Sequence, residues 1–211
     1  MTPHHREYLS PAGSVAFAED EPSRVQLFSV LTVCTGNICR SPAVERLLIA
    51  RLGEDSGVQV SSAGTGAVVG APVSGPMVPL IEASGASAED FVACQLTEGI
   101  VREADLILPL TRRHRRAVVE LQPAAVRRTF TVRELARLCQ TVDPARLPDA
   151  SPAERLAALI PLAAAERGRR YLHNPHDDDV PDPYGLSRSV YGDVFATLAP
   201  AVEIIARLAR G

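Results

Sequence analysis

The sequence VQLFSVLTV at residues 25–33 runs directly into CTGNICRSP at residues 34–42. The first stretch is apolar and rich in β-branched residues, which is typical of a strand buried on both faces of a parallel sheet. In the second stretch, Ser41 and Pro42 can supply the N-cap and the first-turn proline of a helix that continues through residues 43–52. We therefore expect a strand, a short loop and a helix, the unit from which doubly wound α/β folds are built.

Beyond this unit the chain alternates between strand-like and helix-like segments. Apolar runs of strand length predict four strands, at residues 25–33, 58–62, 105–110 and 129–132. Amphipathic stretches predict helices at residues 43–52, 77–83, 98–103, 111–121, 132–139, 153–169 and 187–208. The alternation favours a single doubly wound α/β domain over residues 25–211, with a four-stranded parallel sheet and helices on both faces. Residues 1–24 are polar and lack periodicity, so we expect a flexible N-terminal extension.

The overall composition is that of a soluble globular domain. Hydrophobic residues make up 46% and charged residues 22% of the 211-residue chain, and the net charge of -3 provides no overall positive field for nucleic acid. The sequence has no stretch that resembles a signal peptide and no apolar run long enough to cross a bilayer. Its four cysteines are too few for a disulfide scaffold. We therefore expect a cytoplasmic protein with free thiols, no nucleic-acid partner and no membrane insertion.

The loop at residues 34–41 is where we expect the chemistry. A junction between a strand and a helix offers unpaired N–H groups and the positive end of the helix dipole, which bind anions such as phosphate. Gly36 and Asn37 can adopt positive φ, so successive N–H groups can point into one concave nest. Cys34 would lie at the floor of this nest, where the same dipoles and Arg40 favour its thiolate. The guanidinium of Arg40 could donate two hydrogen bonds to phosphate oxygens.

A thiolate that displaces an oxygen leaving group needs a proton donor, and the loop itself contains no acid. The candidate is Asp182, in the sequence VPDPYG at residues 180–185. The prolines on either side of Asp182 stiffen the backbone, which reduces the entropy lost when the carboxylate is placed.

Together these motifs resemble those of the low-molecular-weight protein tyrosine phosphatases, whose signature is Cys, five residues, Arg and Ser. The motifs that carry the resemblance are CTGNICRSP, SSAGT at residues 61–65, DLIL at residues 105–108 and DPYG at residues 182–185. The resemblance covers about residues 25–208 and implies a phosphatase that hydrolyses phosphotyrosine in proteins without a cofactor or a metal. The length of the chain suggests a bacterial, actinobacterial-type member with an insertion around residues 132–170.

The resemblance also implies a role for each residue of the motifs. Cys34 would be the nucleophile that forms a phosphocysteine, Arg40 would hold the equatorial oxygens, and Asp182 would act as acid and then as base. Ser41 would donate a hydrogen bond to the thiolate, and Asn37 would maintain the shape of the loop. Together with Cys34, Arg40 and Asp182, the residues expected to contact or shape the bound substrate are Thr35, Gly36, Asn37, Ile38, Cys39, Ser41 and Tyr184.

Two features bear on the substrate. Many members of the family have an aromatic wall in the loop after the second strand, where this chain has VVGAP at residues 68–72, so Tyr184 would be the remaining aromatic wall. The branch of the family that acts on phosphoarginine has Thr at the position of Ile38. Because Ile presents an apolar surface suited to a flat ring, the sequence favours phosphotyrosine over phosphoarginine.

Three other functions remain open. The same fold hosts thiol-dependent arsenate reductases, which need a nearby cysteine pair, whereas Cys94 and Cys139 are 45 residues apart in this chain. TRRHRR at residues 111–116 could belong to a non-catalytic module that binds nucleic acid or another anion, although a solvated helix face is the simpler interpretation. The histidines and aspartates at residues 173–179 could hold a metal, but a solvated acidic loop is the simpler interpretation there.

Cys39 allows two interpretations. It could be a small buried hydrophobic residue at the start of the helix. Alternatively, it could be a resolving thiol that traps oxidised Cys34 as a disulfide and so protects it from irreversible oxidation, which is the interpretation that the resemblance favours.

Overall fold

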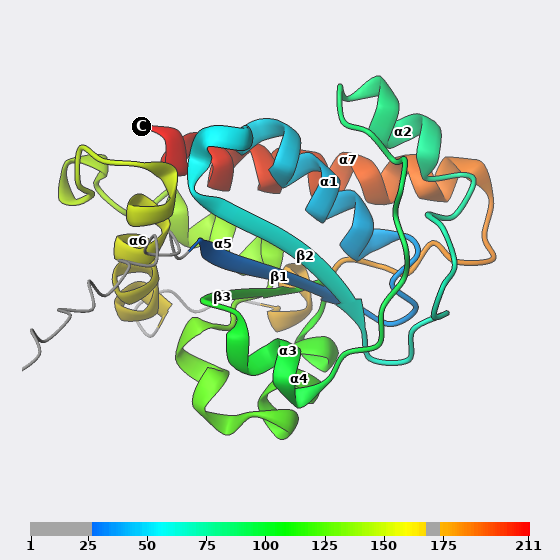
Figure 1. Ribbon diagram of the computed structural model, residues 1–211, viewed down its shortest axis with the longest axis horizontal. Coiled ribbons are helices and arrows are strands. Elements are labelled where there is room, and N and C mark those ends of the chain that lie inside the picture. The colour runs from blue at the N-terminus through cyan, green and yellow to red at the C-terminus, as the bar shows by residue number, and fades with distance from the viewer. Residues whose placement is uncertain (1–26, 168–173) are drawn as a thin grey trace, which may run out of the picture.

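The computed structural model of the protein describes residues 27–167 and 174–211. In these residues, three parallel strands form one sheet in the order β2-β1-β3, with β1 at the centre (Figure 1). β1 spans Phe28–Cys34, β2 spans Val58–Gly64 and β3 spans Leu106–Pro109. The chain therefore leaves β1 toward one side, forms β2, and then crosses to the other side to form β3. The carboxyl end of β1 is the topological switch point of the sheet, the position where folds of this kind bind ligands.

Helices cover both faces of the sheet (Figure 1). Val30 of β1 belongs to a large core formed with α1, α5, α6 and α7, whereas its neighbour Leu31 belongs to a smaller core with α3 and α4. This alternation is the period of two expected of a strand that is buried on both faces. The helices are α1 (Arg40–Leu52), α2 (Val78–Ala83), α3 (Glu98–Glu103), α4 (Arg112–Leu121), α5 (Val132–Cys139), α6 (Pro152–Arg167) and α7 (Arg188–Arg210). The predicted α/β architecture with a parallel sheet is confirmed.

The predicted fourth strand is not present in the described residues. Thr129 forms a single parallel bridge with Ile107, and the N–H of Phe130 donates to the carbonyl of Ile107 at 3.0 Å. The chain then turns at Thr131, whose hydroxyl accepts the N–H of Glu134 while the Glu134 carboxylate accepts the N–H of Thr131. This capping box starts α5 directly after Phe130, so the extended segment ends after one bridge.

Several predictions about the ends of elements fall outside the described residues. These are the flexible extension at residues 1–24, the first residues of the predicted first strand at 25–26, and the end of the helix predicted to reach residue 169. Within the described residues, each predicted helix has a counterpart that begins and ends within about three residues of the prediction.

The last turn of α6 is fastened to the start of α5 by Arg167. Its guanidinium donates to both Glu134 carboxylate oxygens, at 2.7 and 3.1 Å, and to the Thr129 carbonyl at 2.7 Å. It also lies over the ring of Phe130, 4.1 Å from the centroid. Arg167 therefore joins α6 to the segment that replaces the fourth strand.

α7 is the helix, among those of the described residues, that is long and apolar enough to cross a membrane by length and composition. A core helix of a folded domain meets the same criterion. Leu198, Val202 and Ile205 of α7 are each buried in the core shared with α1 and α5. The absence of membrane insertion stays a prediction.

The contacts of Arg167 predict a marked loss of stability when its guanidinium is removed. Arg167→Leu would leave the buried Glu134 carboxylate and the Thr129 carbonyl without their partner, at a cost of about 3 kcal/mol in the free energy of unfolding. Urea unfolding of the variant measures this cost. Arg116→Leu is the matched control, because the ion pair of Arg116 with Glu120 is exposed on α4 and should contribute little. Similar losses in the two variants would contradict the prediction.

Candidate functional site

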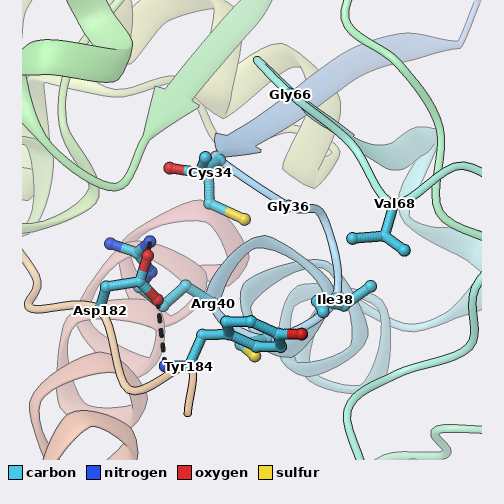
Figure 2. A pocket seen from close by; sticks show the side chains of 10 residues that line it. Cys34, Gly36, Ile38, Arg40, Gly66, Val68, Asp182 and Tyr184 are labelled. Carbon is cyan, nitrogen blue, oxygen red and sulfur yellow. Dashed lines mark hydrogen bonds and ion pairs between the residues drawn. The ribbon is translucent and has the colours of Figure 1, made fainter.

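A pocket lies at the carboxyl end of β1, where the loop of residues 35–39 leads into α1 (Figure 2). It therefore occupies the switch point of the sheet. The segment of residues 180–184, which carries Asp182, and the loop after β2 form the rest of the pocket wall. The lining residues are Cys34, Thr35, Gly36, Ile38, Cys39, Arg40, Gly66, Val68, Asp182 and Tyr184. The structure thus brings together two motifs that are almost 150 residues apart in the sequence.

The loop of residues 35–39 presents its backbone N–H groups away from the neighbouring chain. The carbonyls of Cys34, Thr35, Gly36 and Ile38 all accept hydrogen bonds from backbone N–H groups of residues 65–74, at 2.7 to 3.0 Å. Because the C=O and N–H of a trans peptide point in opposite directions, the N–H groups that follow these carbonyls are directed away from that segment. In the described part of the chain, no protein acceptor takes the N–H groups of residues 35–39. They are available to an anion in the pocket.

Asn37 holds the loop in this shape. Its φ of 54° lies in the left-handed region, as expected for Gly36 or Asn37, whereas Gly36 itself does not need a positive φ. The Asn37 side chain is fully buried, and it donates to Ser41 Oγ at 2.9 Å and to Ser62 Oγ at 2.7 Å. Its carbonyl oxygen accepts the N–H of Cys94 at 2.7 Å. These three bonds join the loop to β2 and to the segment before α3.

The same network sets the direction of the hydrogen bond between Ser41 and Cys34. Ser41 Oγ lies 3.0 Å from Cys34 Sγ. Since the amide nitrogen of Asn37 can only donate, Ser41 Oγ accepts from Asn37 and its own proton is free for the sulfur. Ser41 and Cys34 are both buried. The arrangement therefore provides the Cys34 sulfur with a hydrogen-bond donor, the hydroxyl of Ser41.

Arg40 is buried below the opening of the pocket, with its side chain only 4% exposed. Its Nη1 donates to the carbonyl of Val180 at 3.0 Å, and its Nη2 forms an ion pair with Asp182 Oδ2 (Figure 2). The Nε of Arg40 is buried without a hydrogen-bond partner in the described residues. Because no described protein group accepts this N–H, it can donate to an anion in the pocket, as the loop N–H groups can.

The mouth of the pocket is apolar on the side away from Arg40. Ile38, Val68 and Tyr184 line it, and Val68 and Tyr184 are 49% and 65% exposed. Val68 thus occupies a wall position for which the sequence offered no aromatic residue. Tyr184 is part of the pocket lining, whereas Asn37 and Ser41 are fully buried and are not part of it.

Two residues important for the loop were missed by the sequence analysis. Gly64, at the end of β2, lies against the loop so closely that an added Cβ would overlap the Thr35 carbonyl oxygen, so a side chain is excluded there. His114 of α4 is buried, and its ring is hydrogen-bonded to Thr35 Oγ1 and to Thr111 Oγ1, both at 2.9 Å. Burial, reinforced by the nearby charge of Arg40, lowers the pKa of His114 to about 4, so the ring is neutral at pH 7.

The remaining cysteines are separated in space. Cys94 lies beside the loop through its bond to Asn37, whereas Cys139 lies at the end of α5, beside Ile204 and Leu208 of α7. Burial raises the pKa of Cys139 to about 12. Burial also raises the pKa of Cys39, whose sulfur lies 3.7 Å from the hydroxyl of Tyr191. The part of Cys39 as a resolving thiol stays a prediction.

The acidic loop contacts the start of the arginine-rich helix, whereas Asp177, Arg113 and Arg116 are exposed to solvent as expected. Asp178 and Asp179 bond to arginines of α5 and α4, and His176 contacts Arg112. In the described residues, no group of three His, Cys, Asp or Glu side chains is placed to hold a metal. His173, which the metal interpretation included, lies outside the described residues.

The buried position of His114 predicts a pH-dependent stability. Its folded-state pKa lies below the ordinary value of about 6.5, so the unfolded chain binds more protons between these values. The stability that depends on neutral His114 is complete above pH 6.5 and is lost as the pH falls toward 4. Between pH 7 and pH 5 this loss is about 2 kcal/mol, and His114→Gln should lack it. Urea unfolding at both pH values provides the measurement, and equal losses in the two proteins would contradict it.

Comparisons with known proteins agree with this geometry. The family described as Low molecular weight phosphotyrosine protein phosphatase matches residues 29–158. The chain is similar to Wzb of Salmonella typhimurium, named a low molecular weight protein-tyrosine-phosphatase, with 39% identity over 171 residues that cover 80% of this chain and 85% of that protein.

Solved structures share the fold. The crystal structure of the tyrosine phosphatase AmsI of Erwinia amylovora has a TM-score of 0.62 at 27% identity, and covers 86% of this chain and 92% of that chain. The YwlE arginine phosphatase of Geobacillus stearothermophilus, at 24% identity, has a TM-score of 0.61 and covers 85% of this chain and 91% of that chain, a likeness of fold alone. The family match, the relative and the shared fold lead to one conclusion: the chain belongs to the low molecular weight phosphotyrosine protein phosphatase family.

Proposed function

We propose that this protein is a tyrosine phosphatase that hydrolyses phosphotyrosine monoesters through a phosphocysteine. The observation that carries the proposal is the combination, around the Cys34 sulfur, of unpaired loop N–H groups and a buried Arg40 Nε without a partner. Together these donors can bind a phosphate dianion next to the Cys34 sulfur. Membership of the family and the name of the relative, a protein-tyrosine-phosphatase, support the same activity.

In the first step, the Cys34 thiolate attacks phosphorus on the side opposite the leaving oxygen. The S–P bond forms as the P–O bond breaks, and Asp182 donates its proton to the departing phenolate oxygen. Arg40 and the loop N–H groups hold the equatorial oxygens, where negative charge is concentrated in the transition state. To contact the phosphate, Arg40 Nη2 must leave its ion pair with Asp182. Arg40 Nη1 keeps its hydrogen bond to the Val180 carbonyl.

In the second step, water hydrolyses the phosphocysteine. The Asp182 carboxylate, now deprotonated, takes a proton from the water as its oxygen attacks phosphorus, and the S–P bond breaks to restore the Cys34 thiolate. The hydrogen bond from Ser41 stabilises that thiolate as a leaving group. The cycle consumes one water and releases inorganic phosphate and the phenol.

The apolar mouth supports an aromatic substrate. Ile38, Val68 and Tyr184 can contact the ring of a phosphotyrosine while the phosphate reaches the loop. A phosphoarginine would place a polar guanidinium between the same side chains, where the lining offers no carboxylate other than Asp182. We therefore propose tyrosine-phosphorylated proteins as the partners, and the cytoplasm as the location, since the four cysteines are free.

The roles of Cys34 and Asp182 predict two different kinetic defects. Cys34→Ser removes the nucleophile and should abolish hydrolysis of p-nitrophenyl phosphate. Asp182→Ala removes the proton donor and should lower kcat/KM for phenyl phosphate, whose phenolate departs poorly without a proton, by about 10² to 10⁴-fold while phosphate binding persists. Steady-state rates and inhibition by vanadate measure the two effects. Turnover near that of the wild type in either variant would contradict the assignment.

The apolar mouth also predicts the substrate preference. Initial rates on peptides should be highest for phosphotyrosine and at least about 10-fold lower for phosphoserine and phosphoarginine, whose groups do not fill the ring position. Ile38→Thr should narrow the difference between phosphotyrosine and phosphoarginine. A faster rate on phosphoarginine in the wild-type protein would overturn the preference, and arsenite formation that depends on Cys94 and Cys139 would indicate an arsenate reductase.

A further inference from the structure

The segment that carries Asp182 is attached to the rest of the protein at three consecutive residues, Asp178, Asp179 and Val180. Asp178 bonds to α5, Asp179 to α4 and α5, and Val180 to the residue after β3 and to Arg40 of α1. All three precede Asp182 by two to four positions. Asp182 itself is 48% exposed at its side chain and belongs to the pocket lining. The position of its carboxylate therefore depends on attachments made elsewhere in the segment.

The first attachment joins Asp178 to α5. Arg137 of α5 donates to Asp178 Oδ2 at 2.9 Å through Nη2 and to Oδ1 at 3.4 Å through Nε. The side chain of Asp178 is only 12% exposed. A two-pronged bond to a mostly buried carboxylate restricts both the distance and the orientation of the loop.

The second attachment joins Asp179 to the start of α4. Asp179 Oδ1 accepts the backbone N–H of Arg112, the first residue of α4, at 2.6 Å, so the carboxylate lies where the helix dipole favours an anion. The side chains of Arg112 and His176 lie near the other oxygen, at 3.9 and 3.2 Å. In addition, Arg133 of α5 donates to the carbonyl of Asp179 at 3.3 Å.

The third attachment is made by the backbone of Val180. Its N–H donates to the carbonyl of Leu110, just after β3, at 2.9 Å, and its carbonyl accepts from Arg40. Val180 is fully buried. Val180 therefore connects the segment to the residue after β3 and to Arg40, the arginine expected to bind phosphate.

These attachments matter most when substrate is bound. In the free pocket Asp182 is held by its ion pair with Arg40 and by the N–H of Tyr184. The mechanism turns Arg40 Nη2 toward the phosphate, so the ion pair is lost in the complex. The carboxyl group is then aimed at the leaving oxygen by the Tyr184 N–H together with the fixed backbone before Asp182.

We propose that Asp178 and Asp179 are positioning residues for proton transfer by Asp182, with Arg137 and the N-terminus of α4 as their anchors. The proposal rests on the proposed function, in which Asp182 is the acid. α5 lies at the start of the predicted insertion at residues 132–170. In this proposal α5 contributes to the reaction by holding the segment that carries Asp182.

The test uses the different need of two substrates for an acid. The nitrophenolate leaving group of p-nitrophenyl phosphate departs readily without a proton, whereas the phenolate of phenyl phosphate needs one. A poorly aimed acid should therefore lower kcat/KM for phenyl phosphate by about 10-fold and for p-nitrophenyl phosphate by less than about 3-fold. We expect this pattern in Asp178→Asn and in Asp179→Asn of the full-length protein.

Asp177→Asn is the matched control, since it makes the same change at an exposed neighbour in the same turn and should leave both rates unchanged. The double variant Asp178→Arg with Arg137→Asp exchanges the two charges and keeps the ion pair. Its kcat/KM for phenyl phosphate should therefore be close to that of the wild type and well above that of Asp178→Asn. Competitive inhibition by sulfate should stay within about 2-fold of the wild type in every variant, because a tetrahedral anion bound by the loop has no leaving oxygen to protonate.

Asp182→Ala provides the reference that separates the two proposals. If Asp182→Ala does not discriminate between the substrates, Asp182 is not the acid and the positioning proposal falls with it. If Asp182→Ala discriminates but Asp178→Asn and Asp179→Asn lower both rates equally, or neither, the acid stands and the positioning role is overturned.

Discussion

The site depends on Asn37, whose side chain is buried and whose backbone has a left-handed φ. Its amide and carbonyl hold Ser41, Ser62 and the backbone of Cys94, so the loop is tied to β2 and to the segment before α3. The turn at Asn37 directs the N–H groups of the loop into the pocket, and its amide leaves the proton of Ser41 free for Cys34. Nucleophile and anion site are therefore prepared by the same three hydrogen bonds.

Local sequence signals predicted most of the fold. The apolar run before Cys34 and the proline at position 42 act over a few residues, and the strand and helix that they indicate are present. The helix begins at Arg40, so Ser41 lies inside it and not at the predicted N-cap position. The prediction of a fourth strand was wrong because two local signals overlap. Residues 129–132 have strand composition, but the capping box at Thr131 begins α5 inside that run. Of the predicted fourth strand, the described residues contain a single bridge between Thr129 and Ile107.

The site was predictable where its chemistry is written in consecutive residues, and less so where it depends on distant partners. Cys34, Arg40 and Asp182 stand in motifs. His114 carries no such signal, since its partner Thr35 is 79 residues away. Gly64 matters because two backbones approach, which only the folded chain reveals. Asp178 and Asp179 read as solvated acids because Arg137 and the start of α4 meet them only in the folded protein.

The ion pair between Arg40 and Asp182 has a consequence for the ions that surround the protein. The Arg40 guanidinium is paired with the Asp182 carboxylate, so an incoming anion must compete with that carboxylate for Arg40. A monovalent ion such as chloride gains too little from the loop to displace that carboxylate, whereas a doubly charged tetrahedral oxyanion engages the guanidinium and several N–H groups at once. We therefore expect the ion pair to make the site selective for doubly charged oxyanions over monovalent ions.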